Sequence, residues 1–219
     1  MSKHLNRELD KLKRDLLAVS AIVKESIEKS MMAFFENRQD LAEQVVDDDR
    51  IIDEREVEIE EECLKLLALH QPVAEDLRFI AAVMKINNDL ERMGDSAVGI
   101  ARRSLHYAQR KPIALPEELK KMTIIANNMV EQSLKAFVER DTALARAVCK
   151  KDDEADQLQA SILKDLKNVM KSDSESISVA LDLFTITRRL ERIADLATNI
   201  SEDVIYMVEG HIVRHNKDK

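Results

Sequence analysis

The chain has 219 residues and a formal net charge of -8, with charged residues at 35% and hydrophobic residues at 45%. This length is enough for one domain or two small ones with a buried core, and the hydrophobic content excludes a disordered chain. Three glycines and three prolines are too few for the frequent turns of a β-sandwich, a barrel or a Rossmann fold. The composition therefore predicts an all-α protein.

The acidic balance argues against nucleic acid as a partner, because phosphate binding needs clustered lysine and arginine. No apolar run approaches the roughly 20 residues of a membrane span, and residues 1–10 contain no apolar signal region. Cys63 and Cys149 lie far apart within helical patterns, which favours free thiols in a reducing compartment over a disulfide. We expect a cytoplasmic protein without direct membrane insertion.

Hydrophobic periodicity predicts three helices before a central linker. Apolar residues recur at steps of four and three from Leu5 to Phe34, which indicates a helix of roughly 30 residues followed by a polar turn, residues 37–40. A second helix is expected over about residues 41–69, because Pro72 disfavours the helical conformation in the residue before it. Pro72 is suited to begin a third helix that runs to about Arg110.

The second half of the chain repeats the first. After the proline-bearing linker, residues 111–116, helices are expected near 117–139, 142–171 and 175–209. A shift of 103 positions pairs similar residues from Phe34 with Phe137 to Ile59 with Ile162, and a shift of 100 pairs Leu90-Glu91-Arg92 with Leu190-Glu191-Arg192. One loop indel separates the two registers. The sequence thus predicts two tandem three-helix bundles, residues 1–110 and 117–210, followed by a polar tail, residues 211–219.

Pairs of carboxylates recur at the same places in both repeats. The second and fifth helices carry a DxxxD pair each, and the third and sixth carry an ExxxD pair each, one helical turn apart. The eight residues are Asp49, Asp53, Glu91, Asp95, Asp152, Asp156, Glu191 and Asp195. The ExxxD pairs continue the apolar rows Leu77-Ala81-Met84 and Ile177-Leu181-Phe184, so they occupy positions where the pattern predicts core residues.

Neighbouring buried carboxylates repel one another and lose their hydration, so something must offset their charge. We favour a polyvalent cation held by oxygen ligands from two adjacent helices, such as magnesium, manganese, calcium or iron. One alternative is a network with Arg92 and Arg192, which stand beside the motifs. Another is simple exposure near a helix end.

Little in the sequence favours catalysis. Di-iron enzymes built in helical bundles use an ExxH motif on two helices, and this chain contains none. The five histidines lie outside the carboxylate motifs, and zinc chemistry would require histidine or cysteine ligands there. We therefore assign no catalytic residue and do not expect an enzyme.

Three segments of the chain carry distinctive motifs: His70-Gln71-Pro72-Val73-Ala74-Glu75-Asp76-Leu77-Arg78, Leu90-Glu91-Arg92-Met93-Gly94-Asp95 and Leu190-Glu191-Arg192-Ile193-Ala194-Asp195. In this order they resemble the PhoU family of accessory proteins in bacterial phosphate-specific transport. The resemblance covers nearly the whole chain. It implies two three-helix bundles and multinuclear clusters of iron, or of zinc, manganese, magnesium or calcium, held by the eight carboxylates. Ala194 departs from the glycine usual in the family, which predicts a weaker cluster in the second half.

The resemblance also implies a function. It predicts a cytoplasmic, often dimeric, metal-binding adaptor that negatively regulates the phosphate-starvation (Pho) response and phosphate uptake. Its expected partners are the ATPase subunit of the phosphate transporter (PstB-like) and a sensor histidine kinase (PhoR-like). The alternatives are a metalloenzyme that uses the carboxylate clusters for hydrolytic or redox chemistry, and a metal-free helical scaffold.

Overall fold

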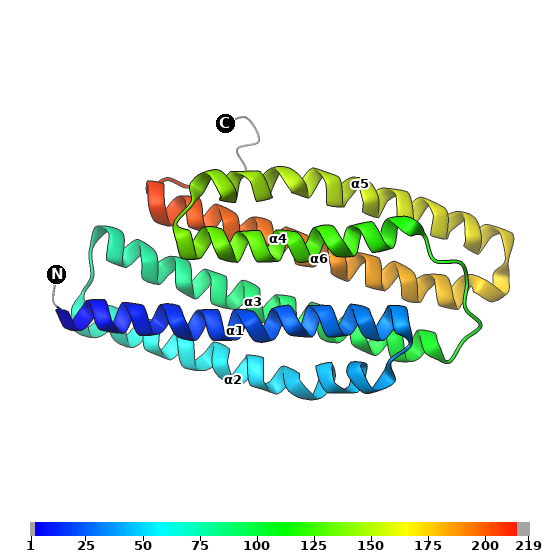
Figure 1. Ribbon diagram of the computed structural model, residues 1–219, viewed down its shortest axis with the longest axis horizontal. Coiled ribbons are helices and arrows are strands. Elements are labelled where there is room, and N and C mark those ends of the chain that lie inside the picture. The colour runs from blue at the N-terminus through cyan, green and yellow to red at the C-terminus, as the bar shows by residue number, and fades with distance from the viewer. Residues whose placement is uncertain (1–2, 214–219) are drawn as a thin grey trace.

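The computed structural model describes residues 3–213, and these residues form six long α-helices and no strand (Figure 1). The helices are α1 (Lys3–Glu36), α2 (Gln39–His70), α3 (Ala74–Ala108), α4 (Glu117–Glu139), α5 (Thr142–Ser172) and α6 (Ile177–Glu209). A short 3-10 turn, η1 (Ser174–Ser176), precedes α6. The predicted all-α class is confirmed. Most of the expected polar tail, residues 214–219, lies outside the described residues.

Helices α1–α3 pack on one another, and α4–α6 do the same, which gives two three-helix bundles in tandem (Figure 1). The two bundles lie side by side, and α3 and α6 form most of the contact between them. Buried apolar side chains from all six helices join in one continuous core. None of the helices in the described part of the chain combines the length and the apolar character needed to cross a membrane.

Both bundles use the same turn after their first helix. Asn37 and Arg140 each adopt the left-handed conformation with φ of 55°. In each case the next residue donates its N–H to the helix: from Arg38 to the Ala33 carbonyl and from Asp141 to the Ala136 carbonyl, both at 3.0 Å. The two turns are related by the shift of 103 residues, so they are equivalent features of the repeat.

The loop indel falls between the second and third helices of each repeat. Gln71, with φ of 45°, ends α2 and donates its N–H to the Leu67 carbonyl, and Val73 is extended. The third helix therefore begins at Ala74, two residues later than the position of Pro72 predicts. In the second repeat Asp173 alone separates α5 from η1. The three residues 71–73 thus account for the change of shift from 103 to 100.

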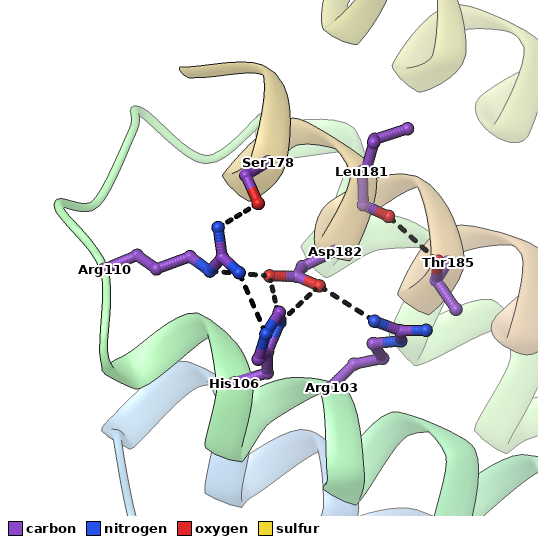
Figure 2. Close-up of polar contacts among 7 residues, drawn as sticks. All are labelled: Arg103, His106, Arg110, Ser178, Leu181, Asp182 and Thr185. Carbon is purple, nitrogen blue, oxygen red and sulfur yellow. Dashed lines mark hydrogen bonds and ion pairs between the residues drawn. The ribbon is translucent and has the colours of Figure 1, made fainter. Parts of the chain in front are cut away.

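A buried carboxylate at each end of the α3–α6 contact holds the two bundles together. Asp182 of α6 is 2% exposed. Figure 2 shows it among Arg103, His106 and Arg110, whose nearest nitrogens lie 3.3, 3.0 and 3.6 Å from its oxygens. At the other end, buried Asp203 accepts from Lys85 Nζ at 3.0 Å. Because a buried charge without a partner is destabilising, these pairs fix the alignment of the two helices.

Candidate metal centres

The second bundle brings together carboxylates from two helices. Asp152 and Asp156 lie on α5, and Glu191 and Asp195 lie on α6. Asp156, Glu191 and Asp195 each offer one oxygen, and the three oxygens lie within 4.8 Å of one another. The two exposed carboxylates, Asp156 and Asp195, leave the cluster open to solvent on one side.

Asp152 supplies the buried part of this second cluster. Its Oδ1 is buried and makes no hydrogen bond of normal geometry to any described residue, and the same is true of the hydroxyl of Thr198. Burial raises the pKa of Asp152, as does the charge of Asp156, while the nearby Thr198 hydroxyl partly lowers it. A buried carboxylate oxygen that lacks a well-formed hydrogen bond is costly unless a cation approaches it.

The charges of the second cluster are strongly coupled. Desolvation by the surrounding protein raises the pKa of Asp195 to about 7, and the charges of Glu191, Asp152 and Asp156 contribute to this rise. Arg188 opposes the rise, and it lies 3.6 Å from Glu191. Oxygen donors that repel one another in this way are the ligands that hard cations prefer. The four residues therefore fit a metal such as iron, manganese or magnesium.

The first bundle has the equivalent cluster in a looser arrangement. Asp49 and Asp53 of α2 face Glu91 and Asp95 of α3, with the same pattern of two half-buried and two exposed residues. Burial raises the pKa of Asp49, followed by the charges of Asp53 and Asp95. Burial also raises the pKa of Glu91, followed by Asp95 and Asp53. Among the described residues, however, no three carboxylate oxygens of this cluster converge within 4.8 Å.

The second cluster is the more compact one although it carries Ala194. Ala194 is fully buried, as is its counterpart Gly94. A Cβ placed on Gly94 would lie 2.9 Å from Cδ1 of Ile52 and 3.8 Å from Oδ1 of Asp49. The glycine therefore lets α2 approach α3 closely beside the first cluster. The prediction that metal binds more weakly in the second half remains a prediction.

Arginines do not neutralise the clusters as the salt-bridge alternative requires. Arg92 donates to the buried Asp89 at 3.0 Å instead of to the carboxylates of its own motif. Glu191 is paired with Arg188 instead of Arg192. In the described part of the chain, the other seven carboxylates have no cation closer than 4.0 Å. This leaves most of the negative charge of the clusters uncompensated.

The prediction that the ExxxD pairs occupy core positions is wrong. The apolar rows that lead to them are partly exposed: Leu77 is 44% exposed and Leu181 is 50% exposed. The buried face of α3 instead runs through Ile80, Val83 and Ile86. These helices carry two apolar rows, and packing against the neighbouring helices selects the other one. The carboxylates consequently lie at the boundary between core and solvent.

Three residues near the clusters escaped the sequence analysis. Burial raises the pKa of Glu56, followed by the charges of Glu60 and Asp53, which places Glu56 beside the first cluster. Its counterpart at a shift of 103 is Gln159, whose Nε2 is buried without a hydrogen bond among the described residues. Thr198, beside Asp152, is the third. The repeat alignment contains the signal for the first pair, because it places two polar residues at equivalent positions of α2 and α5.

The fold and the clusters together define a class: all-α proteins of two repeated three-helix bundles, each with an acidic cluster between its last two helices. The sequence comparison agrees with this description. The model of the PhoU domain matches residues 16–104 and 119–204, one match in each bundle. The chain belongs to the PhoU family.

Close relatives support the assignment along the full length. The chain is 39% identical to the phosphate-specific transport system accessory protein PhoU homolog of Aquifex aeolicus, with 98% of this chain and 97% of the relative covered. The crystal structure of PhoU from Pseudomonas aeruginosa superposes with a TM-score of 0.92 at 35% identity, over 94% of this chain and 99% of that one. The phosphate transport system regulatory protein PhoU of Streptococcus pneumoniae gives 0.89 at 32% identity, covering 95% and 99%.

Proposed function

We propose that this chain is a cytoplasmic, metal-binding adaptor, not an enzyme, that negatively regulates the phosphate-starvation response and phosphate uptake. The observation that carries the proposal is the pair of uncompensated acidic clusters in a chain whose relatives are named accessory and regulatory proteins of phosphate transport. Carboxylates alone provide ligands for a cation. The clusters include no histidine, cysteine or serine nucleophile, which is consistent with a regulatory role for the metal.

Regulation by contact requires exposed surface suited to other proteins. The partly exposed apolar rows, with Leu77 on α3 and Leu181 and Phe184 on α6, provide such surface. Each row leads directly into an ExxxD motif, so a metal bound there would lie beside the docking surface. The proposed partners are the transporter ATPase subunit and the sensor histidine kinase, and the chain is proposed to act as a homodimer.

A genetic test with a binding assay distinguishes the adaptor from its alternatives. Deletion of the gene should leave alkaline phosphatase expression high in phosphate-rich medium, and the wild-type chain should restore repression. Pull-down should retain the ATPase subunit and the cytoplasmic part of the kinase, and a Leu181→Asp, Phe184→Asp variant should lose at least one of them. If the deletion strain represses normally and neither partner is retained, the adaptor proposal is refuted.

The metal needs its own measurement. Elemental analysis of protein purified without added metal should find iron, or one of zinc, manganese, magnesium and calcium, bound to the eight carboxylates. The combined variant Glu91→Ala, Asp95→Ala, Glu191→Ala, Asp195→Ala should lack it. A metal-free wild-type chain that still represses the response would show that the clusters are not needed for regulation.

A further inference from the structure

Three metal-binding side chains meet at one end of the first bundle, outside both acidic clusters. His4 and Glu8 lie one turn apart at the start of α1, and His70 is the last residue of α2, at the same end of the bundle (Figure 1). One nitrogen of each histidine and one oxygen of Glu8 lie within 4.8 Å of one another. We propose that His4, Glu8 and His70 form a binding site for a divalent transition metal such as Zn²⁺.

The spacing of the donor atoms suits tetrahedral zinc. His70 Nε2 lies 2.8 Å from Glu8 Oε2, and His4 Nε2 lies 3.3 Å from Glu8 Oε1. Zinc bonds of about 2.0–2.1 Å place neighbouring tetrahedral donors about 3.3 Å apart. The two rings meet edge to face, with centroids 5.6 Å apart and planes at 79°. Small side-chain movements therefore replace the contact between His70 and Glu8 with two bonds to one metal ion.

Two of the three ligands are held in place by the fold. The side chains of Glu8 and His70 are 23% and 19% exposed, and they already contact each other. His70 sits where α2 ends, and the left-handed Gln71 fixes that end through its N–H bond to the Leu67 carbonyl. His4 is 69% exposed and closes the site from the solvent side. Three protein ligands leave one position of a tetrahedral metal for water.

The chemistry of this site differs from that of the acidic clusters. Imidazole nitrogens select zinc, nickel or copper, whereas sets of carboxylates alone suit harder cations. Because the ligands come from α1 and α2, a bound ion links the first turns of the chain to the far end of the second helix. Metal binding there is expected to stabilise the first bundle.

Zinc titration of the full chain tests the proposal. The chain is expressed with a cleavable tag that contains no histidine, stripped with EDTA and titrated with ZnCl₂ at neutral pH by calorimetry, with Co²⁺ absorption as a probe of imidazole ligation. The tested variants are His4→Gln and His70→Gln. The matched control is His211→Gln, which removes an exposed histidine paired with Glu209. The variant Glu191→Ala, Asp195→Ala removes competing carboxylates of the second cluster.

We expect one zinc site, distinct from any zinc held by the acidic clusters, whose affinity falls by at least about tenfold in His4→Gln and in His70→Gln, since even changes behind the ligands cost about 10- to 100-fold. The control and the carboxylate variant should retain this site. Zinc should raise the melting temperature of the wild type more than that of His4→Gln.

Unchanged zinc affinity in both histidine variants would overturn the proposal, as would loss of all zinc binding in the carboxylate variant. His70→Gln removes a contact with Glu8, so it can disturb folding. The exposed His4 offers a test without this difficulty, because its replacement leaves the contact between His70 and Glu8 intact. Circular dichroism in EDTA identifies a variant that has not folded.

Discussion

The carboxyl group of Asp195 should destabilise the metal-free protein at neutral and alkaline pH. Its pKa rises from 3.8 to about 7 because the folded protein desolvates it and places three other carboxylates nearby. Between these two values the native state holds a proton that the unfolded chain has released. Stability therefore falls as the pH rises from about 4 to about 7, and the full penalty persists at higher pH.

The size of the penalty follows from the shift and from solvent screening. At about 1.4 kcal/mol per pKa unit, the rise to about 7 corresponds to about 4 kcal/mol between the two protonation states. Asp195 is exposed, so water and salt screen much of this interaction, and we expect about 1–2 kcal/mol. Asp195→Asn should stabilise the metal-free protein by this amount at about pH 8, which raises the melting temperature by about 2–8 °C.

The assay is thermal and urea unfolding in EDTA at about pH 4.5 and about pH 8. The stabilising effect should be largest at the higher pH and much smaller at the lower one, which lies only slightly above the pH of about 4 at which the penalty begins. Asp165→Asn, which changes an exposed carboxylate further along α5, is the control and should shift stability by less than about 0.5 kcal/mol. With Mn²⁺ added, the wild type should become more stable than Asp195→Asn, because it keeps the metal ligand that the variant has lost.

One result would refute this reasoning. If Asp195→Asn is less stable than the wild type at about pH 8 without metal, the carboxylate takes part in a stabilising interaction with a cation. Arg188 is the cation whose charge lowers the pKa of Asp195. The second cluster would then be a salt-bridge network, although around Arg188 and not around the Arg192 of the sequence alternative.

Three further predictions concern the first cluster and the packing of the helices. Glu91→Ala with Asp95→Ala should remove metal from the first bundle and leave the second loaded, as measured by elemental analysis, because the ligands come from separate helix pairs. Asp182→Ala should lower the free energy of unfolding by about 2–4 kcal/mol in urea, since it removes the buried carboxylate that Arg103, His106 and Arg110 share at the α3–α6 contact. Gly94→Ala should change stability by less than about 1.5 kcal/mol in the same assay, because the nearest atom is the flexible end of Ile52 and alanine favours the helix.

Each of these predictions has an outcome that contradicts it. Unchanged metal content after loss of Glu91 and Asp95 would exclude them as ligands. If Asp182→Ala lowers the free energy of unfolding by less than about 0.5 kcal/mol, water solvates the partners of Asp182 as favourably as the carboxylate does. A loss above about 3 kcal/mol for Gly94→Ala would show that α2 and α3 cannot separate by the few tenths of an ångström that a methyl group requires.

The helices, the repeat and the acidic pairs could be predicted from the sequence because each depends on local or periodic information. Scarce glycine and proline leave helix as the only regular structure, and the shifts of 103 and 100 locate the repeat and its indel between α2 and α3. The exact residues at which helices begin and end could be predicted less well. Pro72 suggests an early start for α3, but the left-handed Gln71 and extended Val73 postpone it to Ala74. Such backbone conformations depend on the tertiary placement of the flanking helices.

The sequence also determined which residues form the two acidic clusters, since spacing of four places each pair on one helix face. Only the tertiary structure decided how deeply they lie and what surrounds them. Helix α3 carries two apolar rows, and periodicity cannot tell which one neighbouring helices will cover. In the folded protein the neighbouring helices cover Ile80 and Val83 and leave Leu77 partly exposed. The motifs therefore lie at the edge of the core. Asp182 and its partners, and the meeting of His4 with His70, arise from contacts between distant segments, which helical spacing does not encode.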